Sequence, residues 1–140
     1  MEPSPLLQTV EHETAHSPEW CVLWLHGLGA DGHDFAPIVP ELVRPGWPAI
    51  RFVFPHAPMR AVTINSGMRM RAWYDIRNFS ADELGGGDRA DSAGVFESIA
   101  QVEAVVIGCR RCPRLVAWRE EVARTRRAAR AAGSAATRAR

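Results

Sequence analysis

Two glycines, Gly27 and Gly29, flank Leu28 directly after an apolar run at residues 20–25 and the histidine His26. Glycine lets the backbone turn tightly at the end of a strand, and such a turn leaves N–H groups near Leu28 without partners. N–H groups held in this way can stabilise the alkoxide that develops on a carbonyl oxygen during acyl transfer. The alternative interpretation of these residues is an ordinary glycine turn.

Acyl transfer also requires a nucleophile, and Ser92 and Ser66 are the two serines considered for this role. Ser92 lies in the segment ADSAG, which follows GGGDR rather than a strand. A nucleophilic serine of this type is exposed by a strained turn from a strand into a helix. We therefore interpret Ser92 as a helix cap, and Ser66, in a loop, is no better a candidate.

Three histidines, His26, His33 and His56, lie near these segments. A general base in a serine hydrolase must be oriented by an acid and must reach a serine. Nothing in the sequence provides that set, so we expect His26 to support the glycine turn rather than to move protons.

Cys109 and Cys112 form a C-x-x-C pair, and Cys21 lies in the apolar run. Two thiolates at this spacing can bind one metal ion or cluster, but a [4Fe–4S] cluster needs four ligands. We therefore favour two free thiols, name Cys109 and Cys112 only as weak metal candidates, and predict no cofactor.

The elements that must position these residues are a strand, a helix and a second strand. Residues 20–25 are continuously apolar, which is typical of a strand buried on both faces of a mostly parallel sheet. Residues 35–43 have helical spacing of apolar side chains, and residues 50–54 form a second apolar run. A strand, a helix and a strand in this order predict the α/β class and a parallel pair.

The remaining segments are predicted more coarsely. Residues 1–19 are expected to be a mobile arm, with a short edge strand at Leu6 to Val10 as an option. Residues 55–87 are read as a long loop over the sheet. Helices are predicted from residue 91 or 92 to about 106 and, as a solvent-facing helix with a loose end, from residue 113 to about 132.

Charge divides the chain near residue 108, and every basic residue is Arg. Residues 1–108 hold 7 Arg and 14 acidic residues (7 − 14 = −7), whereas residues 109–140 hold 10 Arg and 2 Glu (10 − 2 = +8). The tail suits nucleic-acid binding, but the absence of Lys beside abundant Ala and Arg also suits a GC-rich coding sequence, which we favour. No membrane span or secretory signal is visible, so we expect a cytoplasmic protein.

Four segments resemble the phospholipase/carboxylesterase and acyl-protein thioesterase family of α/β-hydrolases, over residues 20–107. They are VLWLHGLGADGHDF, RFVFPHAP, NSG followed by MRAWYDI, and DSAGVFESIAQVEAVV. The resemblance implies hydrolysis of a small acyl ester or thioester, with the Leu28 N–H as oxyanion donor. It implies that the acyl substrate is bound by Gly27, Gly29, Met70, Trp73 and Tyr74, with Pro55, Pro58 and Asp75 nearby.

The resemblance stops after Gly108, where the family continues into a G-x-S-x-G nucleophile elbow that this sequence lacks. We therefore predict a truncated α/β-hydrolase that is inactive alone. Residues 109–124, CRRCPRLVAWREEVAR, resemble the N-terminal segment of iron–sulfur uracil-DNA glycosylases. The predicted domains are an arm at 1–19, a partial hydrolase at 20–107 and a basic helical tail at 108–140.

Two alternatives to a hydrolase remain open at this point. The first is a nucleic-acid-binding or metal-binding module formed by residues 109–140. The second is a non-catalytic protein that binds a partner through an exposed sheet edge.

Overall fold

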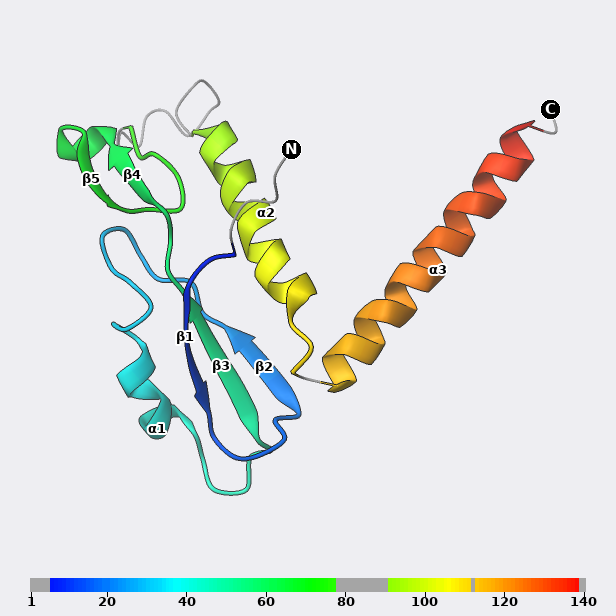
Figure 1. Ribbon diagram of the computed structural model, residues 1–140, viewed down its shortest axis with the longest axis horizontal. Coiled ribbons are helices and arrows are strands. Elements are labelled where there is room, and N and C mark those ends of the chain that lie inside the picture. Colours follow the sequence, from blue (N-terminus) through cyan, green and yellow to red (C-terminus); the bar gives the residue numbers. More distant parts are fainter. Residues whose placement is uncertain (1–5, 78–90, 112, 139–140) are drawn as a thin grey trace.

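The computed structural model describes residues 6–77, 91–111 and 113–138, with side chains up to residue 126. A small sheet lies at the centre of the molecule, with a β-hairpin beyond one end of its strands and helix α2 on one side (Figure 1). Helix α3 extends away from this body. The arrangement of sheet and flanking helices confirms the predicted α/β class.

The sheet has the strand order β1-β3-β2. Strands β2 (Trp20–Leu23) and β3 (Ile50–Pro55) are parallel, which confirms both predicted strands and their relative direction. The predicted burial of the first strand on both faces is wrong, because β2 ends at Leu23 and none of its four residues is buried. All six residues of β3 are buried, as expected for the central strand of a covered sheet. Strand β1 (Thr9–Glu13) pairs with β3 in the antiparallel direction, so the three described strands form a mixed sheet.

Strand β1 corrects the prediction of a mobile arm at residues 1–19. Residues 9–13 form the edge of the sheet, three positions beyond the start of the short strand suggested at Leu6 to Val10. Thr14 extends the pairing, because its N–H donates to the Ile50 carbonyl and its hydroxyl accepts from the Ile50 N–H, both at 2.9 Å. Residues 1–5 lie outside the described residues, and the division into domains stays a prediction.

One face of the sheet packs on the segment that follows β2. Val39, Ile50, Phe52 and Phe54 form the buried cluster there. The helix predicted at residues 35–43 is a 3-10 turn, η1 (Ala36–Ile38), followed by one α-helical turn, α1 (Val39–Leu42). Pro40 falls inside the predicted helix, where proline cannot donate the backbone hydrogen bond, so the segment is divided into two short pieces that each have a proline in their first turn.

The predicted long loop at residues 55–87 contains a hairpin, which the sequence did not indicate. Strands β4 (Met59–Val62) and β5 (Met68–Arg71) are antiparallel and are joined through a 3-10 turn, η2 (Thr63–Asn65). Ser66 (φ 54°) and Gly67 (φ 75°) have left-handed backbone conformations at the corner. Residues 78–87 of the predicted loop lie outside the described residues.

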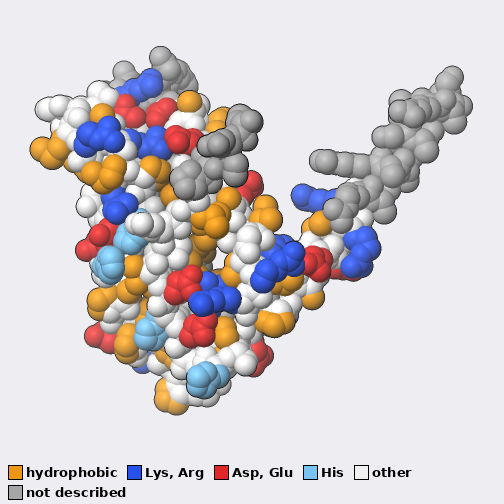
Figure 2. Space-filling model, viewed as in Figure 1, with side chains coloured by type: hydrophobic (Ala, Val, Ile, Leu, Met, Phe, Trp, Pro, Cys, Tyr) orange, Lys and Arg blue, Asp and Glu red, His pale blue; other side chains and the backbone are white. Residues whose placement is uncertain are grey.

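Helix α2 (Ser92–Gly108) confirms the predicted helix but corrects its cap. Asp91, rather than Ser92, is the N-cap residue, and its carboxylate accepts from the Gly94 N–H at 2.9 Å. Phe96 and Ile107 on this helix are 70% and 62% exposed. Hydrophobic side chains are visible at the surface alongside α2 (Figure 2).

Helix α3 (Pro113–Arg138) continues past the loose end predicted after residue 132. Its Ala and Arg residues are good helix formers, and they carry the helix through Gly133. No single helix of the described residues has the length and apolar character needed to cross a membrane. Only α2 together with residues 113–126, a pair bent by 114°, meets the length and composition criteria.

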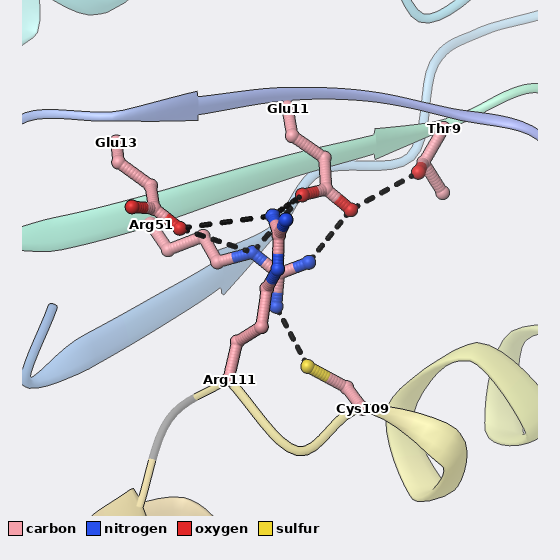
Figure 3. A network of polar contacts seen from close by, with 6 residues as sticks. All are labelled: Thr9, Glu11, Glu13, Arg51, Cys109 and Arg111. Carbon is pink, nitrogen blue, oxygen red and sulfur yellow. Dashed lines mark hydrogen bonds and ion pairs between the residues drawn. The ribbon is translucent and has the colours of Figure 1, made fainter. Parts of the chain in front are cut away.

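An ionic network fixes the segment after α2 to the sheet (Figure 3). Arg51 of β3 donates to Glu11 of β1 at 2.6 Å, and Arg111 donates to the same carboxylate at 2.6 Å. A further Arg51 N–H lies 2.6 Å from the Cys109 sulfur. A cavity of about 420 Å³ lies beside the network, between the sheet and the end of α2. The side chain of Arg51 is only 6% exposed, so this charge depends on its partners.

Replacing Asp91 by alanine should lower the free energy of unfolding by about 1 kcal/mol, because the cap of α2 is lost. The Gly94 and Asp75 N–H groups hold the pKa of the Asp91 carboxyl below its usual range. This contribution is therefore present above about pH 4 and is lost as the pH falls through the lowered pKa. Urea denaturation of wild type and Asp91→Ala should show a difference at neutral pH that shrinks in acid.

Glu97→Ala is the matched control for the cap. Glu97 is on the same helix and pairs with Arg60, as Asp91 does, but it caps nothing. It is 57% exposed at the side chain, so its loss should change stability by less than about 0.5 kcal/mol. Equal losses for the two variants would contradict the capping role.

Candidate functional site

The Leu28 turn begins where the chain leaves β2. The Ala30 N–H donates to the Gly27 carbonyl at 3.3 Å, and Gly29 has φ +75°. A positive φ at the third of four residues is what a type II turn requires, and glycine adopts it without strain. Residues 27–30 therefore form the tight turn predicted from the two glycines.

The turn explains why the Leu28 N–H is available. In a four-residue turn the second residue's N–H takes no part in the closing hydrogen bond. The Gly29 N–H is already used, because it donates to the Arg71 carbonyl at 3.0 Å. Among the described residues, no hydrogen-bond acceptor pairs with the Leu28 N–H, and Leu28 is 38% exposed. A backbone donor is thus presented at the surface beside the carboxyl end of a parallel strand.

His26 supports this turn, as its position in the sequence predicted. Its ring is buried, and Nε2 accepts from the Ala57 N–H at 3.0 Å. Since Nε2 is the acceptor, the proton of a neutral ring lies on Nδ1, which donates to the Gly27 carbonyl at 2.7 Å. His26 therefore ties the turn after β2 to the end of β3, and neither ring nitrogen is left to act as a base.

Trp73 holds the same turn through its contacts with His26. Its indole N–H donates to the His26 carbonyl at 2.9 Å, and its ring centroid lies 5.3 Å from that of His26. The Trp73 carbonyl in turn accepts from the Ser98 hydroxyl on α2. Helix α2 is thereby connected through Trp73 to the Leu28 turn.

The other residues that the sequence analysis placed at or near the substrate differ in how they lie relative to the Leu28 turn. A Cβ built on Gly29 would lie 3.8 Å from the Met70 sulfur, so Met70 lies against the turn. Tyr74 is 41% exposed. Asp75 has a structural role, because its carboxylate accepts from the N–H and hydroxyl of Thr63 at 2.7 and 2.6 Å.

Gly32 and His56 also help to hold the loop that contains the Leu28 turn, and the sequence did not indicate their contact. The Gly32 N–H donates to Nδ1 of His56 at 3.1 Å. A Cβ at Gly32 would collide with the Phe54 carbonyl oxygen. Both contacts join positions more than twenty residues apart, so no local sequence pattern predicts them.

Gly32→Ala should therefore destabilise the protein by about 2 kcal/mol, because the colliding atom is backbone of the central strand and cannot move aside. Gly27→Ala is the matched control in the same loop, since nothing lies within 4 Å of its Cβ position. Thermal or urea denaturation of both variants measures the difference. A Gly32→Ala protein as stable as Gly27→Ala would show that the loop does not pack on β3 as described.

The two candidate nucleophiles do not have the geometry of an elbow. Ser92 is the first residue of α2, after its Asp91 cap, and it is not among the described residues with positive φ. Ser66 does have a positive φ, but it lies at the corner between β4 and β5 rather than after a parallel strand. Neither position presents a serine at the end of a parallel strand, where the Leu28 turn lies.

Cys109 is held by the protein itself rather than arranged for a metal. Its sulfur is 2.6 Å from an Arg51 N–H. Partial burial raises the pKa of the Cys109 thiol, but hydrogen bonds from the Arg111 N–H and from Arg51 outweigh it and lower that pKa overall. Cys112 lies outside the described residues, so the predicted pair of thiols stays a prediction.

Comparisons with known proteins agree with this geometry. Residues 8–108 match the sequence profile of the phospholipase/carboxylesterase family. Acyl-protein thioesterase 1 of Cryptococcus neoformans is 34% identical over 85 residues, which are 61% of this chain and 34% of the relative. Acyl-protein thioesterase 1 homolog 1 of Dictyostelium discoideum is 38% identical over 93 residues, covering 66% of this chain and 38% of the relative.

Two solved structures are similar over the same part of the chain. Acyl-protein thioesterase 2 of Zea mays has a TM-score of 0.57 and 28% identity over 71% of this chain and 39% of its own. SOBER1 of Arabidopsis thaliana has a TM-score of 0.53 and 32% identity over 64% of this chain and 40% of its own. This chain thus spans about a third of the length of the first curated relative and about two fifths of these structures.

Proposed function

Because this chain belongs to the phospholipase/carboxylesterase family of α/β-hydrolases, we propose that it carries the oxyanion-stabilising part of an ester or thioester hydrolase site. The observation that carries the proposal is the Leu28 turn, whose N–H has no acceptor among the described residues. A fixed backbone donor costs no reorganisation when the negative charge develops, which makes it effective in acyl transfer. The substrate is a small acyl ester or thioester.

The acyl group in this proposal lies along the turn, between Gly27 and the hairpin. Met70 provides a flexible apolar contact beside Gly29. Trp73 fixes the turn through its hydrogen bond to the His26 carbonyl and adds apolar surface. Tyr74, exposed and next to Trp73, completes the proposed substrate contacts. The chain is expected to need no cofactor and to act in the cytoplasm.

The chain alone is proposed to be inactive. It contains no G-x-S-x-G sequence, and its serines at positions 66 and 92 lie in a hairpin corner and at a helix start. The acyl-protein thioesterases that it matches are more than twice as long as the shared part. Catalysis would thus require a nucleophile, an acid and a base that these 140 residues do not supply.

Reconstitution tests the proposal. The Zea mays acyl-protein thioesterase 2 is divided where its similarity to this chain ends, and its C-terminal part is mixed with this chain. Hydrolysis of a short p-nitrophenyl ester should appear only in the mixture. The two halves of the maize protein, mixed in the same way, are the positive control. If those halves recover activity and this chain never substitutes for the N-terminal half, the proposal is wrong.

The alternative of a nucleic-acid or metal-binding module at residues 109–140 stays a prediction, and the structure offers no observation in its favour. Several of the Arg side chains already have partners within the chain. Arg110 pairs with Glu120, Arg111 with Glu11 and Arg124 with Glu121. A salt-dependent affinity for DNA would support the alternative, because Arg–phosphate contacts release counterions.

A further inference from the structure

We propose that Asp31, His33 and His56 form a binding site for a single Zn²⁺ ion, distinct from the Leu28 donor. One ligand atom from each of these residues lies within 4.8 Å of the other two. Asp31 and His33 are in the loop that follows the turn, and His56 directly follows β3. The inference uses only the geometry of these three side chains, so it does not depend on the proposed hydrolase function.

The spacing of the first two ligands already suits zinc. Oδ1 of Asp31 and Nδ1 of His33 are 3.2 Å apart. In a tetrahedral zinc site with bonds of about 2.0–2.2 Å, neighbouring ligand atoms are roughly 3.3 Å apart. An ion can therefore replace the proton between these two atoms without moving them. The His56 nitrogen, at no more than 4.8 Å, has to approach by roughly 1.5 Å or less.

The donor set selects the metal. Two imidazoles and one carboxylate are ligands that Zn²⁺ accepts, whereas Mg²⁺ and Ca²⁺ prefer oxygen ligands throughout. Three protein ligands leave the fourth position to water. The side chains of His33 and Asp31 are 72% and 38% exposed, so the ion can enter from solvent, while His56 is 8% exposed and lies on the inner side of the site.

Zinc binding must be coupled to the loop, because His56 already has a hydrogen-bond donor. The Gly32 N–H donates to its Nδ1 at 3.1 Å. A neutral imidazole has one lone pair on its two nitrogens, so His56 cannot accept from Gly32 and bind a metal at the same time. Whichever nitrogen binds zinc, the Gly32 bond is lost. Zinc would thus loosen the loop on which the Leu28 turn depends.

Hydrogen bonds inside the cluster also explain its shape without a metal. The His33 N–H donates to Oδ1 of Asp31 at 2.7 Å, and the Asp31 N–H donates to Oδ2 of Asp34 at 2.6 Å. The experiment must therefore separate a metal site from a hydrogen-bonded loop. It must also separate this site from the thiols, because Cys109 and Cys112 are alternative zinc ligands.

Calorimetric titration of the full chain with Zn²⁺ tests the proposal. We expect one ion per chain, at least tenfold weaker binding in His33→Ala and in Asp31→Asn, and unchanged binding in Cys109→Ser. His12→Ala is the matched control, because His12 is also an exposed histidine but lies on β1. His33 is exposed, so its variant should fold normally. No binding, or binding unaffected by His33→Ala, would overturn the proposal.

Two spectroscopic readouts report on the ligands directly. Co²⁺ bound in place of zinc should give visible d–d bands without the thiolate charge-transfer absorption that cysteine ligands produce. The Gly32 amide should exchange its hydrogen with solvent faster when zinc is bound. A thiolate band abolished by Cys109→Ser would place the metal on the cysteines and overturn the proposal, as would a Gly32 amide that keeps its protection in the zinc-bound protein.

Discussion

Proline at position 28 is expected to lower turnover by the reconstituted hydrolase by roughly 10²–10³-fold, because it removes the Leu28 N–H that the turn presents as a donor. Leu28 precedes Gly29, whose own N–H is committed to the Arg71 carbonyl and cannot replace it. The loss should appear in kcat more than in KM, since the donor acts on charge that exists only in the transition state.

Leu28→Ala is the matched control for this prediction. It shortens the side chain but keeps the N–H, so turnover should stay close to that of wild type. Circular dichroism must show that the proline variant folds, because a misfolded turn would also reduce turnover. A folded Leu28→Pro protein with undiminished kcat would exclude Leu28 as the oxyanion donor.

Glu11→Gln is expected to lower the free energy of unfolding by about 2 kcal/mol, the scale of a hydrogen bond between charged groups, because the pair with Arg51 is only partly buried. Glu11 contacts Nη2 and Nε of Arg51 at 2.6 and 3.3 Å, and Arg51 is 6% exposed at its side chain. Burial raises the pKa of the Glu11 carboxyl, but the hydrogen bonds and charge of Arg51 outweigh burial and lower that pKa overall. This carboxylate is therefore charged at neutral pH. Glutamine keeps the shape and removes the charge, leaving the Arg51 cation buried.

The neighbouring carboxylate provides the control for this prediction. Glu13 lies on the same strand at 3.9 Å from Arg51 and 3.8 Å from Arg111, and its side chain is 38% exposed. Glu13→Gln should therefore cost less than about 0.5 kcal/mol. Urea denaturation of both variants at neutral pH provides the comparison. Equal losses would mean that Arg51 is stabilised by general negative charge rather than by its direct bonds to Glu11.

Glu11 also shows why the sequence placed β1 only as an optional strand at Leu6 to Val10, three residues too early. Strand β3 is apolar apart from Arg51, so residues 50–54 were identifiable from the sequence alone. The sequence of β1, TVEHE, has one strongly apolar residue, and its order depends on β3 and on Arg51, about forty positions away. Local patterns cannot reveal such a partner.

The hairpin was missed for a related reason. Strands β4 and β5 have the sequences MRAV and MRMR. MRMR alternates between apolar and charged residues, but each strand has only four residues, which is too short a pattern to separate a strand from a loop. Their pairing is fixed by the turn with Ser66 and Gly67 in left-handed conformations. The cap of α2 was misassigned to Ser92 because Asp and Ser are equally good N-cap residues and lie next to each other.

The Leu28 turn was more predictable from the sequence than the contacts that hold it in place. The Leu28 turn follows from the two glycines after a buried strand, and the structure contains it. The contacts that hold it, from Trp73 to the His26 carbonyl and from Gly32 to His56, join segments that meet only in the fold. Sequence patterns therefore located the Leu28 turn but not the residues that fix its position.

The central claim is that this chain carries an oxyanion donor without its own nucleophile. The most direct test is hydrolysis of p-nitrophenyl butyrate by the purified chain, with its fold checked by circular dichroism and with Ser92→Ala alongside. We predict no turnover above the buffer rate for either protein. Turnover by wild type that is lost in Ser92→Ala would contradict the claim, because Ser92 would then be a nucleophile and the site complete within these 140 residues.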